Sequence, residues 1–184
     1  MGETSVPERE KFLVDRMQTP LGDAVLIAGE DGRLCMYCWD DPEETWRTRF
    51  RRCRGDVELV SCHDPFGHVA ALQRYFDGEI AALDTISVAF GGSPFQNKVW
   101  TALRAIRGGT TLSYGALARR IGEPKAVRAV GLANGRNPIG VVVPCHRVIG
   151  SDGSLTGYGG GLMRKRWLLE HEARHTPFHL EAPQ

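Results

Sequence analysis

A pair of glycines followed by a helix start divides this chain into two parts of different character. The residues at 91–96, GGSPFQ, first end a short apolar strand and then present a capping box with proline at the first helical position. Strand-like segments precede this point, and apolar residues at helical spacing follow it. We therefore predict an α+β fold with an N-terminal domain over 1–90 and a mainly helical C-terminal domain over 91–184, with a weakly structured tail after about 173.

The N-terminal part is predicted to contain a small antiparallel sheet. Segments 12–18, 21–29 and 33–39 have the composition of strands, and Glu30-Asp31-Gly32 can form a hairpin turn in which glycine takes a positive φ. Two helix starts are expected, at Asp41-Pro42 and at Asp64-Pro65. The apolar residues expected to pack inward from these two helices are Trp46, Phe50, Val69, Leu72 and Phe76.

Charge is unevenly distributed along the chain. Residues 1–90 hold 10 Lys or Arg and 17 Asp or Glu, a net charge of −7, whereas residues 91–184 hold 13 and 5, a net charge of +8. This split suggests that only the second part meets a polyanion, although chance clustering of surface charge would give the same numbers. No apolar run approaches the roughly 20 residues of a membrane span, and the polar N-terminus lacks the layout of a secretory signal. We expect a cytoplasmic protein that does not bind a membrane.

Five cysteines, an odd number, are expected to be free thiols in a reducing compartment. Cys35 and Cys38 lie three residues apart in a predicted strand, so their side chains should point to opposite faces and not share a metal. A second set could form a metal site only if the fold gathers it, and buried or idle thiols are the other explanation: Cys53, Cys62, His63 and His68.

The region 113–137 is predicted to form a helix-turn-helix. Ser113 can cap a helix over 114–121 that ends at Gly122, and Pro124 can open a second helix over 125–135. On that second helix Val127 and Val130 can pack inward, leaving a shallow face that would suit a narrow groove. A tightly packed internal helix explains the same composition equally well. The residues of the shallow face, with the arginine at its flank, are Ala126, Ala129, Ala133 and Arg128.

The sequence VVVPCHRVIG at 141–150 places a cysteine and a histidine inside an apolar run. A thiolate is a strong nucleophile, and a nearby base increases the ionised fraction of a cysteine at neutral pH. Pro144 should end a strand at Cys145 and leave the sulfur facing a pocket. A histidine base needs a third group to orient it, and Glu172 is the carboxylate that we expect. A buried structural thiol beside a surface His146 is the alternative.

A glycine-rich segment, GSDGSLTGYGGG at 150–161, follows the cysteine. Its backbone could approach a flat ligand, which Tyr158 could cover. The spacing of a dinucleotide motif or a P-loop is missing, so we expect no nucleotide and no other cofactor.

Taken together, PCHRVIG, the upstream Asn137-Pro138, the RAVG segment and the downstream GYGGG-x-x-x-K-x-W-L-L pattern resemble the O6-alkylguanine-DNA alkyltransferases, the methylated-DNA–protein-cysteine methyltransferases. The resemblance is ordered over about residues 90–172 and weaker in the first part. It implies a winged helix-turn-helix-like C-terminal domain and a protein that is used once. Such a protein, expected to be a monomer, binds double-stranded DNA in the minor groove, flips an alkylated guanine out and takes the alkyl group irreversibly onto Cys145. O4-alkylthymine is an alternative substrate.

The resemblance also implies roles for individual residues. Tyr114 would press on a phosphate and approach the base, and Arg128 would fill the space that the base vacates. Asn137 would organise the active-site turn, and His146 and Glu172 would activate the sulfur through a water. Further DNA contacts are implied for Ala126, Ala129 and Ser151, and a base pocket for Val148, Tyr158, Gly159 and Gly160.

Three departures from the family pattern affect these expectations. Glu123 places an acid in the turn of the helix-turn-helix, where it could weaken DNA binding or point away. Gly159 lacks a side chain that some relatives have, which could leave room for larger alkyl groups. The N-terminal zinc ligands of some relatives have no match, so no metal is expected. The competing functions are a lesion-flagging protein, a thiol-sensing transcription factor and a cysteine hydrolase.

Overall fold

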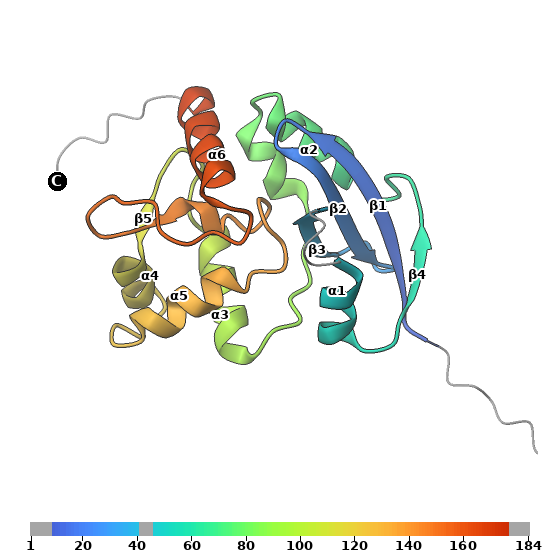
Figure 1. The fold of residues 1–184 in the computed structure, drawn as a ribbon, viewed down its shortest axis with the longest axis horizontal. Coiled ribbons are helices and arrows are strands. Elements are labelled where there is room, and N and C mark those ends of the chain that lie inside the picture. Colours follow the sequence, from blue (N-terminus) through green and yellow to red (C-terminus); the bar gives the residue numbers. More distant parts are fainter. Residues whose placement is uncertain (1–8, 41–45, 177–184) are drawn as a thin grey trace, which may run out of the picture.

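The computed structural model describes residues 9–40 and 46–176 (Figure 1). The elements of its first part are β1 (Lys11–Thr19), β2 (Gly22–Gly29), β3 (Leu34–Trp39), α1 (Trp46–Arg54), β4 (Glu58–Ser61), α2 (His68–Phe76) and a 3₁₀ helix (Ile80–Thr85). Those of its second part are α3 (Pro94–Arg104), β5 (Leu112–Ser113), α4 (Tyr114–Arg120), α5 (Val127–Gly135), a 3₁₀ helix (Cys145–Arg147), β6 (Val148–Ile149) and α6 (Leu162–His175). The predicted α+β class is confirmed.

The N-terminal sheet is mixed, and not wholly antiparallel as predicted. Its strand order is β3-β2-β1-β4, with antiparallel pairs β1–β2 and β2–β3. Strand β4 instead runs parallel to β1, because α1 carries the chain across before it pairs. The three predicted strands are confirmed, and Gly32 has a φ of 78° in the turn that joins β2 to β3.

The helices of the first part differ from the prediction mainly at their starts. Helix α2 begins at His68, later than the predicted start at Asp64-Pro65. The Asp64 carboxylate still accepts hydrogen bonds from the backbone amides of Val69 (2.8 Å) and Ala70 (3.1 Å), so it stabilises this helix end from a preceding turn. The predicted start at Asp41-Pro42 lies outside the described residues, although Trp46 is buried on α1 as expected.

The capping box at the start of α3 is confirmed. The Ser93 hydroxyl accepts from the backbone amide of Gln96 (3.3 Å), and the Gln96 side chain accepts from the backbone amide of Ser93 (2.9 Å). The strand expected just before it is only an isolated bridge between Val88 and Leu34.

The helix-turn-helix is present as α4 and α5, with corrections in the second helix. Helix α5 begins at Val127, and Pro124 lies in the preceding turn. Val130 is buried, but Val127, predicted to pack inward, is 38% exposed. Ala133, predicted on the shallow outer face, is buried, and its carbonyl accepts from the Trp100 indole at 2.9 Å. Relative to the prediction, helix α5 is rotated about its axis, and its outer face carries side chains larger than alanine.

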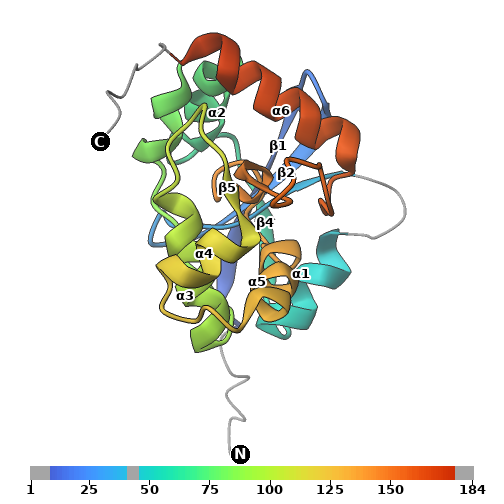
Figure 2. The same cartoon turned by 90° about the vertical axis from the view of Figure 1, so that its left-hand side faces the viewer.

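The larger hydrophobic core contains residues of both predicted domains, including Leu26 and Tyr37 from the sheet and Val99 and Leu117 from the second part. A smaller core lies between the sheet and α1. Figure 2 shows α4, α5 and α1 in the lower half of the molecule and α6 across the top. The domain boundary at residue 90 therefore stays a prediction.

Helix α6 continues to His175, so the first residues of the tail that was expected to be weakly structured after 173 are helical. No helix within 9–40 and 46–176 combines the length and the apolar character needed to cross a membrane.

Candidate functional site

Cys145 lies in a tight coil, and not at the end of a strand as predicted. The valines before it form turns, in which the Val143 amide donates to the Ile139 carbonyl (2.9 Å) and the Cys145 amide donates to the Val143 carbonyl (2.7 Å). Val141 has a φ of 63°, which is unfavourable for a β-branched residue. Such strain is often found at functional sites. Cys145 and His146 then belong to a 3₁₀ turn, so the argument from an extended segment does not apply.

Asn137 holds this coil together. Its side-chain amide donates to the Val143 carbonyl at 2.7 Å, and its side-chain oxygen accepts from the Ile139 amide at 3.0 Å. The asparagine is buried, so both hydrogen bonds are shielded from water. One side chain thus fixes the two ends of the segment that precedes Cys145.

A cavity of about 230 Å³ lies next to Cys145, which is 6% exposed. Three of the four predicted base-pocket residues line it, namely Tyr158, Gly159 and Gly160. The fourth, Val148, does not: its side chain is fully buried in the larger core. A Cβ at Gly159 would approach only the Gly135 carbonyl, at 3.8 Å, so the site has the space that the missing side chain was expected to leave.

The N-terminal part supplies the opposite wall of this cavity, which the sequence did not indicate. Trp39 of β3 and Trp46 of α1 line it, although Trp46 was predicted only to pack inward. Arg49 of α1 lines it too and donates from Nη2 to the Asn137 carbonyl at 3.2 Å.

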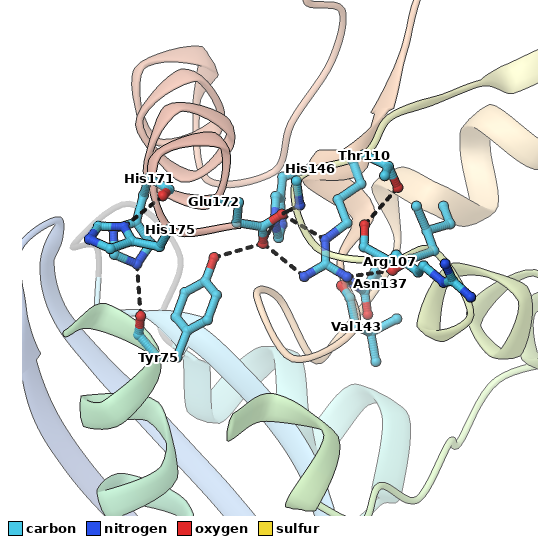
Figure 3. A network of polar contacts seen from close by, with 12 residues as sticks. Tyr75, Arg107, Thr110, Asn137, Val143, His146, His171, Glu172 and His175 are labelled. Carbon is cyan, nitrogen blue, oxygen red and sulfur yellow. Dashed lines mark hydrogen bonds and ion pairs between the residues drawn. The ribbon is translucent and has the colours of Figure 1, made fainter. Parts of the chain in front are cut away.

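Behind Cys145, the Glu172 carboxylate accepts a set of buried hydrogen bonds (Figure 3). His146 Nε2 lies 2.8 Å from Oε1, and the Arg147 guanidinium donates to both oxygens, each at 2.8 Å. The Tyr75 hydroxyl of α2 donates to Oε1 at 2.9 Å, and the Gly109 amide donates to Oε2 at 3.2 Å. The structure thus brings the predicted His146 and Glu172 together and adds partners that the sequence did not indicate.

The pKa values in this network follow from burial and pairing. Burial opposes ionisation of Glu172, but the contacts with His146 and Arg147 outweigh it and hold the pKa of Glu172 well below its usual range. Burial lowers the pKa of His146, so its imidazole is neutral at pH 7. An ionised carboxylate only accepts, so His146 Nε2 carries the proton and Nδ1 has a free lone pair. Nδ1 is buried and has no hydrogen-bond partner among the described residues.

The surroundings of the Cys145 sulfur act on its ionisation in both directions. Burial raises the pKa of Cys145, while the Asn137 side chain and the positive charge of Lys165 act in the opposite direction. The Lys165 ammonium is fully buried and donates to the carbonyls of Val148 (2.6 Å) and Thr156 (2.7 Å). It joins the segment that carries Cys145 to the glycine-rich loop.

The residues expected to contact DNA lie apart from the sulfur. Arg128 and Ala129 are exposed on α5, Ala126 just before α5 is half-buried, and Ser151 is exposed in a turn. Tyr114 begins α4, and its ring lies 3.8 Å from where a Cβ of Gly131 would be, so it lies against α5. The acid in the turn, Glu123, pairs with Lys98 of α3 at 3.2 Å, which partly neutralises it.

No group of three or more His, Cys, Asp or Glu side chains in the described parts of the chain is arranged to hold a metal ion. His68 Nε2 instead lies 3.0 Å from the Gly32 carbonyl. The four residues considered for a metal site are therefore not gathered by the fold.

Comparison with known proteins gives a consistent family. Residues 94–174 match the family model described as "6-O-methylguanine DNA methyltransferase, DNA binding domain". The chain is 47% identical over 166 residues to the methylated-DNA–protein-cysteine methyltransferase of Salmonella typhimurium, covering 88% of this chain and 96% of the relative. It is 59% identical over 111 residues to the protein of that name from Mycolicibacterium paratuberculosis, covering 60% and 67%.

Two crystal structures show the same fold. The O6-methylguanine methyltransferase of Mycobacterium tuberculosis superposes with a TM-score of 0.75 at 39% identity, covering 92% of this chain and 96% of the other. A structure of the Mycobacterium tuberculosis protein in complex with DNA gives 0.74 at 42% identity, covering 91% and 95%. With a relative 47% identical over nearly its whole length, with Cys145 at a cavity and with the next residue, His146, paired with Glu172, this chain belongs to the methylated-DNA–protein-cysteine methyltransferase family.

Proposed function

We propose that the protein repairs alkylated DNA by moving the alkyl group of O6-alkylguanine onto its own Cys145. The observation that carries this proposal is the position of Cys145 at a cavity with the His146–Glu172 pair buried behind it. The relatives' names, which give a cysteine of the protein as the acceptor of the methyl group, support it.

The first step moves a proton. His146 donates from Nε2 to Glu172, so its Nδ1 lone pair is the available base. A bridging water carries the Cys145 proton to Nδ1 while the carboxylate stabilises the imidazolium that forms. Burial favours the neutral thiol by raising the pKa of Cys145, and this proton transfer would supply the thiolate that attacks.

The second step exchanges two bonds. The sulfur forms a bond to the alkyl carbon, the bond from that carbon to guanine O6 breaks, and the electron pair of that bond stays on the guanine. The guanine then takes up a proton and becomes an ordinary base. A thioether carbon has no good leaving group, so Cys145 is not regenerated and each molecule acts once.

DNA binding precedes the chemistry. A guanine inside a duplex cannot reach a sulfur at the base of a cavity, so the base has to be flipped out. Helix α5 would lie in the minor groove, with Arg128 in the space that the base leaves, and Tyr114 would press on the neighbouring phosphate. The flipped guanine would lie between Tyr158 and the Gly159–Gly160 backbone. O4-alkylthymine is a second candidate substrate for the same steps.

An intact-mass measurement tests the transfer. Incubating the protein with duplex DNA that contains O6-methylguanine should add one methyl mass per protein molecule, and Cys145→Ala should abolish the gain. Release of many product molecules per protein would indicate a hydrolase instead. Binding without any mass change would indicate a lesion-flagging protein, and either result would reject the transferase.

A further inference from the structure

Helix α1 is unusually basic for its surroundings. Its nine residues, WRTRFRRCR, include five arginines and no acid. Residues 1–90 hold 10 Lys or Arg, so only five of these lie outside α1, against 17 Asp or Glu. Basic charge in the N-terminal part is therefore concentrated in one short helix.

Three of these arginines, Arg47, Arg51 and Arg52, are exposed, and we refer to them as the α1 arginine patch. Within the described parts of the chain, no carboxylate forms a salt bridge with any of the three. Arg47 lies over the Trp46 ring, with its guanidinium carbon 4.7 Å from the ring centroid. The patch thus presents positive charge to solvent that these carboxylates do not neutralise.

Helix α1, which carries the patch, contributes to the rim of the active-site cavity through other residues. Trp46 and Arg49 of α1 line the same cavity as Asn134 and Gly135 of α5. Figure 1 and Figure 2 both show α1 and α5 in the lower part of the molecule, away from α6. A duplex held against α5 with a base directed at Cys145 must therefore extend over the rim that α1 forms.

We propose that the α1 arginine patch binds backbone phosphates of the duplex beside the damaged base. This inference rests on the proposed function, and it gives the acidic N-terminal part a direct role in DNA binding. A guanidinium suits this task because it stays charged and matches phosphate geometry with paired donors. Arg52 lies three residues after Arg49, on the same side of the helix as that cavity-lining residue. Arg52 is therefore expected to contribute most.

The test compares duplex binding with reaction on a small substrate. Arg52→Ala should weaken binding to a duplex containing O6-methylguanine about fivefold, and Arg51→Ala with Arg52→Ala should weaken it further. Each lost phosphate contact should reduce the slope of log K against log salt by about 0.9. Reaction with free O6-benzylguanine should keep its rate, because that substrate has no phosphate. Arg52→Lys should retain most of the affinity.

Arg174→Ala is the matched control, because Arg174 is an exposed arginine near the end of α6. It should leave both affinity and salt slope unchanged. If the double variant matches the wild type in affinity and salt slope, the role of the patch is rejected while the proposed function stands. If the wild type itself neither binds the duplex nor gains the methyl mass, the proposed function fails first. An equal loss on free O6-benzylguanine would show that the substitutions disturb the cavity, and would also reject the patch.

Discussion

Two cations, Arg147 and Lys165, are buried in the part of the molecule that carries Cys145, the proposed alkyl acceptor, and they differ in how they are paired. The charge of Arg147 is neutralised by a direct ion pair, because its guanidinium donates two hydrogen bonds to the Glu172 carboxylate. Lys165 is also fully buried, but its ammonium donates only to backbone carbonyls, and no carboxylate in the described parts of the chain pairs with it. A carbonyl solvates a charge without cancelling it, so the field of Lys165 extends further than that of Arg147.

The different pairing of Arg147 and Lys165 bears on the pKa of Cys145. The positive charge of Lys165 acts to lower the pKa of Cys145, against the dominant effect of burial. Arg147 and Glu172 instead form a neutral pair that fixes His146 in place. We therefore expect Arg147 to help position His146, and Lys165 to stabilise the negative charge that develops on the sulfur during the reaction. Breaking the Arg147–Glu172 pair and removing the Lys165 charge should therefore affect stability and reactivity in different ways.

The largest effect is expected from Glu172→Gln. This change removes the carboxylate and leaves the Arg147 charge buried without its partner, which typically costs about 3–5 kcal/mol of unfolding free energy. Urea denaturation at pH 7 measures this loss. Alkyl transfer to Cys145 should also slow, because His146 loses the group that orients it. A variant as stable as the wild type would show that Arg147 does not depend on Glu172.

The same pair predicts how stability depends on pH. Glu172 has a lower pKa in the folded state than in the unfolded chain, so its contribution is complete above about pH 4.3, the ordinary glutamate value. It is lost as pH falls from there toward the folded pKa. The stability gap between the wild type and Glu172→Gln should therefore be constant from pH 7 to 5 and should narrow below pH 4. A gap that widens in acid would contradict this sign.

Lys165→Met should have a smaller effect on stability and a different effect on reactivity. Two well-formed hydrogen bonds to carbonyls are lost, at a cost of about 2–4 kcal/mol. Removing the positive charge should raise the pKa of Cys145. The pH at which the rate of reaction with free O6-benzylguanine begins to rise should therefore be higher than in the wild type. Lys165→Arg, which keeps the charge, is the control. Equal pH profiles for all three proteins would reject an electrostatic role.

The contrast between the two cations also shows what the sequence could predict. The sequence was sufficient to predict that His146 and Glu172 meet, which the structure confirms, whereas the catalytic role of Cys145 with this pair stays a prediction. Arg147 follows His146 directly, yet its side chain could not be assigned to the interior from an apolar run that was expected to be a strand. Lys165 is the lysine of the GYGGG-x-x-x-K pattern, but its burial was not predicted, since lysine is seldom fully buried.

The fold was predictable to a similar degree. The strand-like composition of 12–18, 21–29 and 33–39 and the capping box at Ser93 are local signals, and both predictions were confirmed. The parallel pairing of β4 and the cavity wall formed by Trp46 depend on contacts between distant segments. Single-sequence periodicity carries no information about such contacts. Val127 was misassigned for a related reason, because the inward face of a helix depends on where it packs.

Tyr75→Phe is expected to have the smallest effect on stability, and it also tests the positioning network around Glu172. Tyr75 is fully buried on α2, and its hydroxyl is one of several donors to Glu172. Losing it should cost about 1 kcal/mol, the usual worth of one hydrogen bond, because Arg147 and Gly109 still hold the carboxylate. The alkyl-transfer rate should fall only slightly. In Tyr75→Phe with Lys165→Met the two stability losses should add, since the hydroxyl and the ammonium share no partner. Strong coupling between the two substitutions would mean that Lys165 belongs to the same network as Tyr75, Glu172 and Arg147. The distinction between the two cations would then be lost.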